Sequence, residues 1–157
     1  MIPLLNTLIN LTVFTYLLIA TYTDIKTRLI SFKLSIMVIF ICLVINIILL
    51  NFDIKSILLW ILYSCIVGLS LIILAFISKE NIGYGDGIAV LVIGMGNGIK
   101  CSFLSCGFAF ILAAIFASLL LIKKRNTKTT IPFLPFLSTG YTLQYFILWK
   151  HARRFVW

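Results

Sequence analysis

Six uncharged stretches divide this sequence, and they leave few folds open to it. They occupy residues 1–23, 34–52, 56–78, 87–99, 101–122 and 129–149. All except 87–99 are 19 to 23 residues long, which matches the roughly 20 residues that a helix needs to cross a bilayer. Only 11% of the residues are charged and 62% are hydrophobic. A chain with so few polar residues cannot cover the surface of a soluble domain. We therefore expect an all-α polytopic membrane protein.

About six transmembrane helices joined by short loops follow from these stretches. We place them near 3–22, 33–51, 56–77, 84–99, 101–122 and 131–148, with Gly96, Asn97 and Gly98 as a tight turn between the fourth and the fifth. We expect residues 1–157 to form one membrane-embedded domain. The four cysteines contain no C-x-x-C pair, so we expect packed, reduced thiols.

The basic residues predict an orientation in the membrane. Lys and Arg number 13 against four acids, for a net charge of +9. They gather in short loops beside apolar stretches, at 26–33 and 123–128, which indicates contact with anionic lipid headgroups and no nucleic-acid partner. The positive-inside rule then places 24–33, 78–86 and 123–130 in the cytoplasm. The basic tail at 150–154 opposes this placement of the last helix.

The four acids are Asp24, Asp53, Glu80 and Asp86, and we interpret Asp53 and Glu80 as solvated loop charges. The uncharged stretch after Asp86 is too short to cross a bilayer, so the fourth helix must begin before it and draw this carboxylate to the membrane surface. Asp86 also follows Gly83-Tyr84-Gly85, where the backbone can bend and approach another segment closely. Capping of the fourth helix is the structural alternative for Asp86.

Asp24 ends the first predicted helix, and two crossings separate it from Asp86, so both carboxylates emerge on the same face. Two converging carboxylates can share one proton. One can then take a proton from water while the other protonates a carbonyl oxygen, which hydrolyses a peptide. A small membrane carrier or channel subunit could instead use the same pair for a proton or cation. With His151 as the only histidine and no H-E-x-x-H, we expect no metal site.

Three segments resemble type IV prepilin peptidases. Residues 24–30 (DIKTRLI) resemble the family's D-x-x-x-R-x-I-P-N segment, and residues 83–86 (GYGD) resemble its G-x-G-D motif. Residues 131–137 (IPFLPFL) are similar to the I-P-F-x-P-F-L start of the last conserved helix. The chain departs from the pattern at Ser31-Phe32, where the family has Pro-Asn, and at Gly87-Ile88, where Val-Lys is common. These departures bear on which substrate is accepted.

The resemblance implies a membrane aspartic endopeptidase without a cofactor, in which Asp24 and Asp86 are catalytic and Gly83 and Gly85 allow a flexible approach around the second aspartate. It implies removal of the basic leader from prepilin-like proteins, with the cut after a glycine at the cytoplasmic face of the cytoplasmic (inner) membrane. The partners would be a substrate with an N-terminal hydrophobic helix, and membrane lipids.

The longer family members carry a cytoplasmic domain with paired C-x-x-C motifs and methyltransferase activity. This sequence shows no such pair, so we expect no methyltransferase-type domain. The chain is similar to short, peptidase-only members of the family, such as those that serve tight-adherence-type pili. An inactive relative acting as an assembly partner is a third hypothesis, which the two retained aspartates disfavour.

Overall fold

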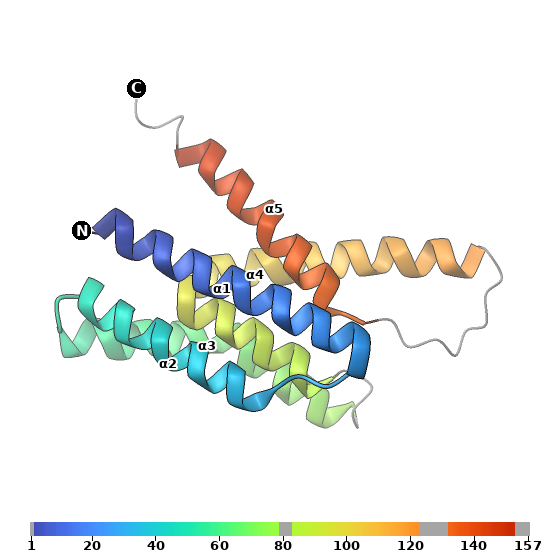
Figure 1. Ribbon diagram of the computed structural model, residues 1–157, viewed down its shortest axis with the longest axis horizontal. Helices are drawn as coiled ribbons and strands as arrows, with labels where there is room; N and C mark the ends of the chain where they lie inside the picture. The colour runs from blue at the N-terminus through green and yellow to red at the C-terminus, as the bar shows by residue number, and fades with distance from the viewer. Residues whose placement is uncertain (1, 79–82, 123–131, 153–157) are drawn as a thin grey trace.

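The computed structural model describes residues 2–78, 83–122 and 132–152, and these residues form helices joined by short turns (Figure 1). The five helices are α1 (Ile2–Thr27), α2 (Phe32–Leu49), α3 (Ile54–Ile77), α4 (Tyr84–Ile122) and α5 (Leu134–Ala152). The all-α prediction is thus confirmed for the described ranges. Glu80, the basic cluster at 123–128, and the tail residues Arg153 and Arg154 lie outside them.

The predicted number of six crossings is not confirmed. Within the described ranges, α1, α2, α3 and α4 are long and apolar enough to cross a membrane, and α5 is not among these candidates. The predicted helices at 84–99 and 101–122 are joined in α4, which is interrupted at Gly98, where φ is 83° and ψ is 175°. The Ser102 hydroxyl donates to the Val90 carbonyl at 3.2 Å, although a straight helix would hold these residues about 18 Å apart. The chain therefore folds back at the predicted turn.

A buried asparagine stabilises this reversal. Breaking a helix leaves the carbonyls of its last turn without intrahelical partners, which is costly where no water can reach them. The Asn46 side chain, 8% exposed, extends from α2 and donates from Nδ2 to the carbonyls of Met95 and Gly96, at 3.2 Å each. Asn46 thus caps the first part of α4 from another helix.

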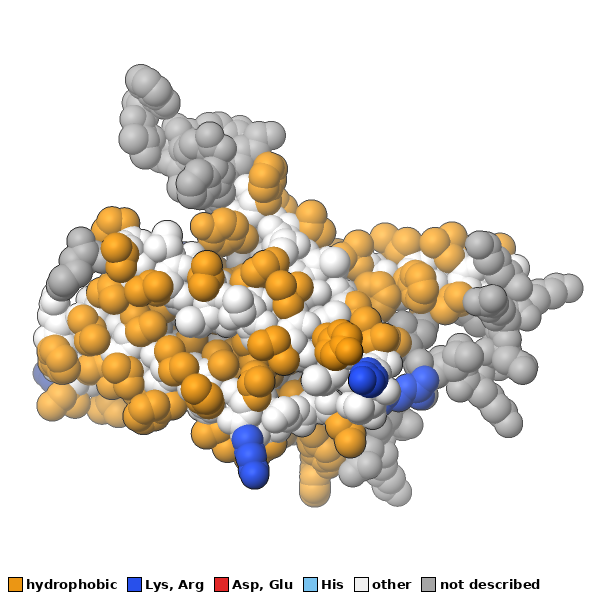
Figure 2. Space-filling view, viewed as in Figure 1, with side chains coloured by type: hydrophobic (Ala, Val, Ile, Leu, Met, Phe, Trp, Pro, Cys, Tyr) orange, Lys and Arg blue, Asp and Glu red, His pale blue; other side chains and the backbone are white. Residues whose placement is uncertain are grey.

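Residues 84–97 of α4 run through the middle of the structure. α4 contacts each of the other four helices, and Ala89, Val90, Val92 and Ile93 are all 0% exposed. A helix segment that is apolar on all sides is stable only when other helices surround it. The outer surface is apolar as well, as Figure 2 shows for one face, and Phe40, Phe76 and Phe146 are at least 66% exposed. Such extensive exposed apolar surface suits contact with lipid.

Small residues allow α3 and α4 to pack closely. A Cβ atom added at Gly68 of α3 would lie 2.5 Å from the Leu91 Cβ, and one added at Gly94 of α4 would collide with the Ser64 carbonyl oxygen. Close backbone approach of this kind is how membrane helices associate when there is no hydrophobic driving force between them. The two glycines therefore supply space and not backbone freedom.

We expect Gly94→Ala to lower the free energy of unfolding in detergent by about 1–3 kcal/mol, because the added methyl group meets backbone that cannot move aside. Gly107→Ala is the matched control: it lies in the same helix and a Cβ there meets nothing within 4 Å. That change should leave stability equal or raise it by about 0.5–1 kcal/mol. Equal thermal midpoints for the two variants would contradict the packing argument.

Candidate functional site

Asp24 lies inside α1 and not beyond its end, because α1 continues to Thr27 and so runs further than predicted. The Thr23 and Thr27 hydroxyls bond back to carbonyls of the preceding turn. The helix then stops at Arg28, whose φ is 55° and whose N–H donates to the Asp24 carbonyl at 2.9 Å. A left-handed residue just past the last turn is a common way to end a helix. Asp24 therefore sits in the last turn of α1, half-buried.

Asp86 lies in the first turn of α4, which begins at Tyr84. Its backbone N–H donates to the Gly83 carbonyl at 3.1 Å, and the Gly83 N–H in turn donates to the Asp86 carboxylate. A side chain in the first turn that reaches back to the residue before the helix is the acidic half of a capping box. The alternative placed Asp86 at the cap of this helix, whereas the structure has it inside the first turn, with Gly83 directly before the helix.

The structure brings Asp24 and Asp86 together. Both are half-buried, and the Asp24 carboxylate lies close enough to Asp86 to act on it electrostatically. Two neighbouring carboxylates in a poorly solvated site disfavour simultaneous ionisation. We call Asp24 and Asp86 the carboxyl pair. The Oδ2 atom of Asp24 is buried and has no hydrogen-bond partner among the described residues, so it is available to accept a proton or a hydrogen bond within this pair.

The start of α5 forms the third side of the site. The Leu134 N–H donates to the Asp24 carboxylate, and the Thr21 hydroxyl donates to the Leu134 carbonyl at 3.3 Å. Thr21 and Asp24 are three residues apart and therefore share one face of α1. A carboxylate near a helix C-terminus opposes the helix dipole, whereas one near a helix N-terminus is stabilised. The N-terminus of α5 and the adjacent charge of Arg28 together offset the unfavourable position of Asp24.

The described part of the segment at 131–137 anchors α5 in this position. The rings of Phe133 and Phe110 have centroids 5.1 Å apart, and those of Phe136 and Phe116 lie 5.4 Å apart. Leu134 is 0% exposed. Aromatic pairs at these separations are favourable beyond the area they bury. The segment therefore packs α5 on the second part of α4 while its backbone reaches Asp24.

Gly83 and Gly85, for which a flexible approach is predicted, each leave space for a neighbouring side chain. Gly98 is the only described glycine with a positive φ. A Cβ atom added at Gly85 would lie 2.9 Å from Cγ1 and 3.3 Å from Cβ of Ile30, and one added at Gly83 would lie 3.3 Å from Oδ2 of Asp86. Gly85 thus lets the α1–α2 loop pack on the start of α4, and Gly83 leaves space beside the carboxylate.

Sequence reasoning did not identify Thr21, Ile30 or Cys106 as neighbours of the carboxyl pair. Cys106 is 6% exposed and lies near enough to Asp86 to interact with it electrostatically. All four cysteines are unpaired, as predicted. Helical spacing alone places Thr21 on the same face as Asp24. The contacts of Thr21 with Leu134, of Ile30 with Gly85 and of Cys106 with Asp86 join separate segments, and the sequence carried no local signal for them.

Asp53 has a structural role far from the carboxyl pair. It caps the N-terminus of α3, where its carboxylate accepts hydrogen bonds from the Ser56 N–H at 3.1 Å and the Ser56 hydroxyl at 2.5 Å. These hydrogen bonds hold the pKa of Asp53 below its usual value. Asp53 is exposed, as expected of a solvated loop charge. Its role as the N-cap of α3 was not predicted.

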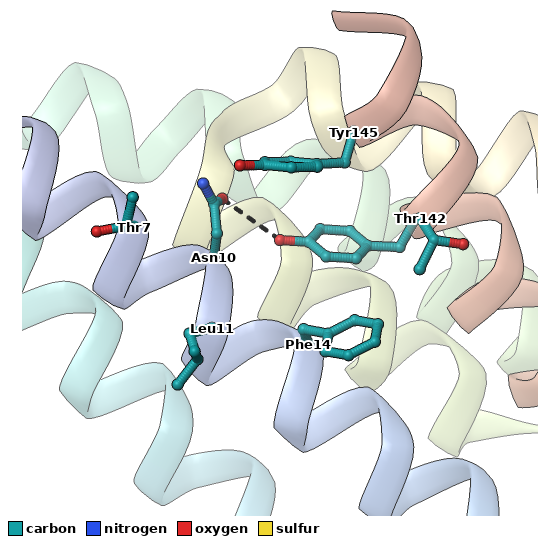
Figure 3. Close-up of a pocket in the computed structure, with 7 residues that line it drawn as sticks. Thr7, Asn10, Leu11, Phe14, Thr142 and Tyr145 are labelled. Atoms are coloured by element: carbon teal, nitrogen blue, oxygen red, sulfur yellow. Dashed lines mark hydrogen bonds between the residues drawn. The ribbon is translucent and has the colours of Figure 1, made fainter. Parts of the chain in front are cut away.

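No three His, Cys, Asp or Glu side chains within the described ranges are grouped so that they could hold a metal ion. A cavity of about 390 Å³ lies elsewhere, between α1 and α5 (Figure 3). Its lining residues are Thr7, Asn10, Leu11, Phe14, Tyr141, Thr142 and Tyr145. None of them belongs to the carboxyl pair or to its immediate neighbours.

The chain matches the model of a known family. Residues 11–121 match the model of the type IV leader peptidase family. The match covers more than two thirds of the chain and includes Asp24 and Gly83–Asp86, but it ends before the segment at 131–137. No curated protein and no solved structure matches the chain.

We expect Thr21→Val to lower peptidase kcat about tenfold, because without the hydroxyl the first turn of α5 is no longer held against Asp24. The family resemblance assigns this aspartate a catalytic role, and small misplacements of such a group are costly. Thr21→Ser keeps the hydroxyl and should retain most of the rate. Steady-state kinetics of both variants in detergent test this. A serine variant as slow as the valine variant would show that the hydrogen bond to Leu134 is not what matters.

Proposed function

Because the chain belongs to the type IV leader peptidase family, we propose that it is an aspartic endopeptidase whose carboxyl pair removes the leader from prepilin-like proteins. Family membership establishes a protease with a protein substrate. The observation that carries the finer proposal is the meeting of Asp24 and Asp86, which come from two helices far apart in sequence. The carrier hypothesis gains no comparable support from the family match.

The surroundings of the two acids suggest different roles. Asp24 has the Leu134 N–H and the Arg28 charge beside it, and both stabilise a negative charge. Asp86 has the Gly83 N–H and a less solvated position, next to another acid. We therefore assign the base to Asp24 and the proton-bearing acid to Asp86.

In the proposed reaction the Asp24 carboxylate takes a proton from a water molecule, whose oxygen attacks the scissile carbonyl carbon. Asp86 gives its proton to the carbonyl oxygen, so a neutral tetrahedral diol forms. Asp24 then returns its proton to the leaving nitrogen while the diol gives a proton back to Asp86, and the C–N bond breaks. Acid–base catalysis of this kind is worth roughly 10²–10⁴ in rate for a positioned group. Each aspartate ends the cycle as it began.

The basic residues suggest the side of the membrane on which this reaction takes place. Lys26, Arg28 and Lys33 are all exposed, and they lie at the end of α1 and the start of α2, beside the carboxyl pair. The positive-inside rule assigns such a cluster to the cytoplasm. We propose a multi-pass protein of the cytoplasmic membrane with its site at the cytoplasmic face, where lipid phosphates would also meet these cations.

We expect Asp24→Asn and Asp86→Asn each to lower leader cleavage by about 10²–10⁴-fold or more, because an amide can neither accept nor donate the required proton. The measurement is co-expression with a prepilin and the mobility shift of the processed product, with membrane fractionation to verify insertion. Asp53→Asn is the matched control, since asparagine also caps helices well, and it should cleave normally. Full cleavage by either variant of the carboxyl pair would refute the proposed mechanism.

A further inference from the structure

The α1–α2 loop, residues 28–31, passes the start of α4 and contacts both halves of the carboxyl pair (Figure 1). Its first residue, Arg28, donates its N–H to the Asp24 carbonyl at 2.9 Å. Its third residue, Ile30, packs on Gly85, directly before the second aspartate: a Cβ atom added at Gly85 would lie 2.9 Å from the Ile30 Cγ1. The conformation of this loop therefore bears on the separation of the two carboxyl groups.

The loop conformation is poorly supported from within. Arg28 has a φ of 55°, and left-handed backbone is unfavourable for a residue that carries a side chain. The Ser31 hydroxyl makes no capping hydrogen bond at the start of α2. The two contacts between Thr27 and Leu29 are 3.4 and 3.5 Å long, which is longer than normal hydrogen bonds. Other elements must therefore help to hold the loop.

A buried pair of hydrogen bonds from α1 provides this support. Ser35, in the first turn of α2, is 0% exposed, and its hydroxyl donates to the Ser31 carbonyl at 3.1 Å. The hydroxyl of Tyr16, which is 1% exposed, lies 2.8 Å from the same Ser35 Oγ. A serine hydroxyl has one proton to donate, so Tyr16 is the donor to Ser35. We call Tyr16, Ser35 and the Ser31 carbonyl the Tyr16 relay. It connects the interior of α1 to the last residue of the loop.

The Tyr16 relay ends at a position where the chain departs from the family pattern. Where the family has proline, this chain has Ser31. A proline ring holds φ near −65° without any hydrogen bond, and Ser31 has a φ of −70°. The relay thus restrains by hydrogen bonds a residue that proline would restrain by covalent geometry. Because the relay is buried, water does not compete for its hydrogen bonds.

We propose that Tyr16 is a positioning residue for the carboxyl pair, which it serves by holding the α1–α2 loop against the start of α4 through Ser35 and Ser31. This inference rests on the proposed function, because positioning is measured on the cleavage rate. Tyr16 precedes Asp24 by eight residues on α1, a separation of about 12 Å. Its hydroxyl therefore acts through the loop and not on the reacting atoms.

Three substitutions separate positioning from stability. Tyr16→Phe removes the hydroxyl and keeps the ring. Tyr22→Phe is the matched control, because Tyr22 lies on the same helix and is 65% exposed. Ser31→Pro restrains the loop by a second route, since φ at this position already suits the ring and the carbonyl that accepts from Ser35 is kept. Ile30 lies outside any helix, as the residue before a proline should.

We expect Tyr16→Phe to lower kcat for leader cleavage about tenfold and to leave KM within about twofold of wild type, because a displaced catalytic group slows the chemical step and not substrate binding. Adding Ser31→Pro should bring kcat back to within about threefold of wild type, because the ring restrains the loop again. Tyr22→Phe should cleave at the wild-type rate. The rates are taken per folded molecule, with the thermal midpoint of each variant measured alongside.

Two outcomes would overturn the positioning role. One is a wild-type kcat for Tyr16→Phe. The other is a double variant, Tyr16→Phe with Ser31→Pro, that regains the thermal midpoint but not kcat, because the relay would then contribute to stability alone.

Amide hydrogen exchange tests the Tyr16 relay without a substrate. The Ser35 N–H donates to the Ser31 carbonyl at 3.1 Å, so its exchange rate reports how firmly the start of α2 is held. We expect this amide to exchange severalfold faster in Tyr16→Phe and at the wild-type rate in Tyr22→Phe; equal rates in the two variants would overturn the relay. If the wild type cleaves no prepilin peptide, the proposed function is refuted, whereas the exchange rates still decide whether Tyr16 holds the loop.

Discussion

The reversal of α4 at Gly98 is the constraint on which the rest of the structure depends. A bilayer requires every backbone polar group to find a partner inside the protein, and a broken helix violates this unless other groups replace the lost bonds. Asn46 does so for Met95 and Gly96. Because these carbonyls have partners, residues 84–97 can form a short helix that the other helices surround. The first turn of this helix carries Asp86 to the position where α1 and α5 also meet.

The site unites helix ends with opposite electrostatic preferences. Asp24 occupies the last turn of a helix, which disfavours a carboxylate, and Asp86 occupies a first turn, which favours one. The start of α5 compensates at Asp24 through the Leu134 N–H. A segment without any ionisable residue therefore takes part in the electrostatics of the site, and its phenylalanines serve to hold one backbone amide in place.

The sequence was sufficient for the helical membrane class, for the turn near Gly98 and for the expectation that Asp24 and Asp86 lie near each other, because long apolar stretches and rare acids are local signals. It was insufficient for the contacts that complete the site. Nothing near Asn46 reveals that its partners lie almost 50 residues later, and nothing near Thr21 points to Leu134. The predicted number of membrane crossings was also not confirmed. α5 contains the polar residues Ser138, Thr139, Thr142 and Gln144, and it is not among the helices apolar enough to be candidate spans.

The contact between Gly85 and Ile30 has a consequence for how this site can diverge. The two residues share one small volume beside the carboxyl pair, so the size of one limits the size of the other. A lineage that gains a methyl group at position 85 must lose volume at position 30, or else the α1–α2 loop moves away from α4 and the separation of the two carboxyl groups changes. These two positions, neither of which is ionisable, are therefore expected to change together over evolution.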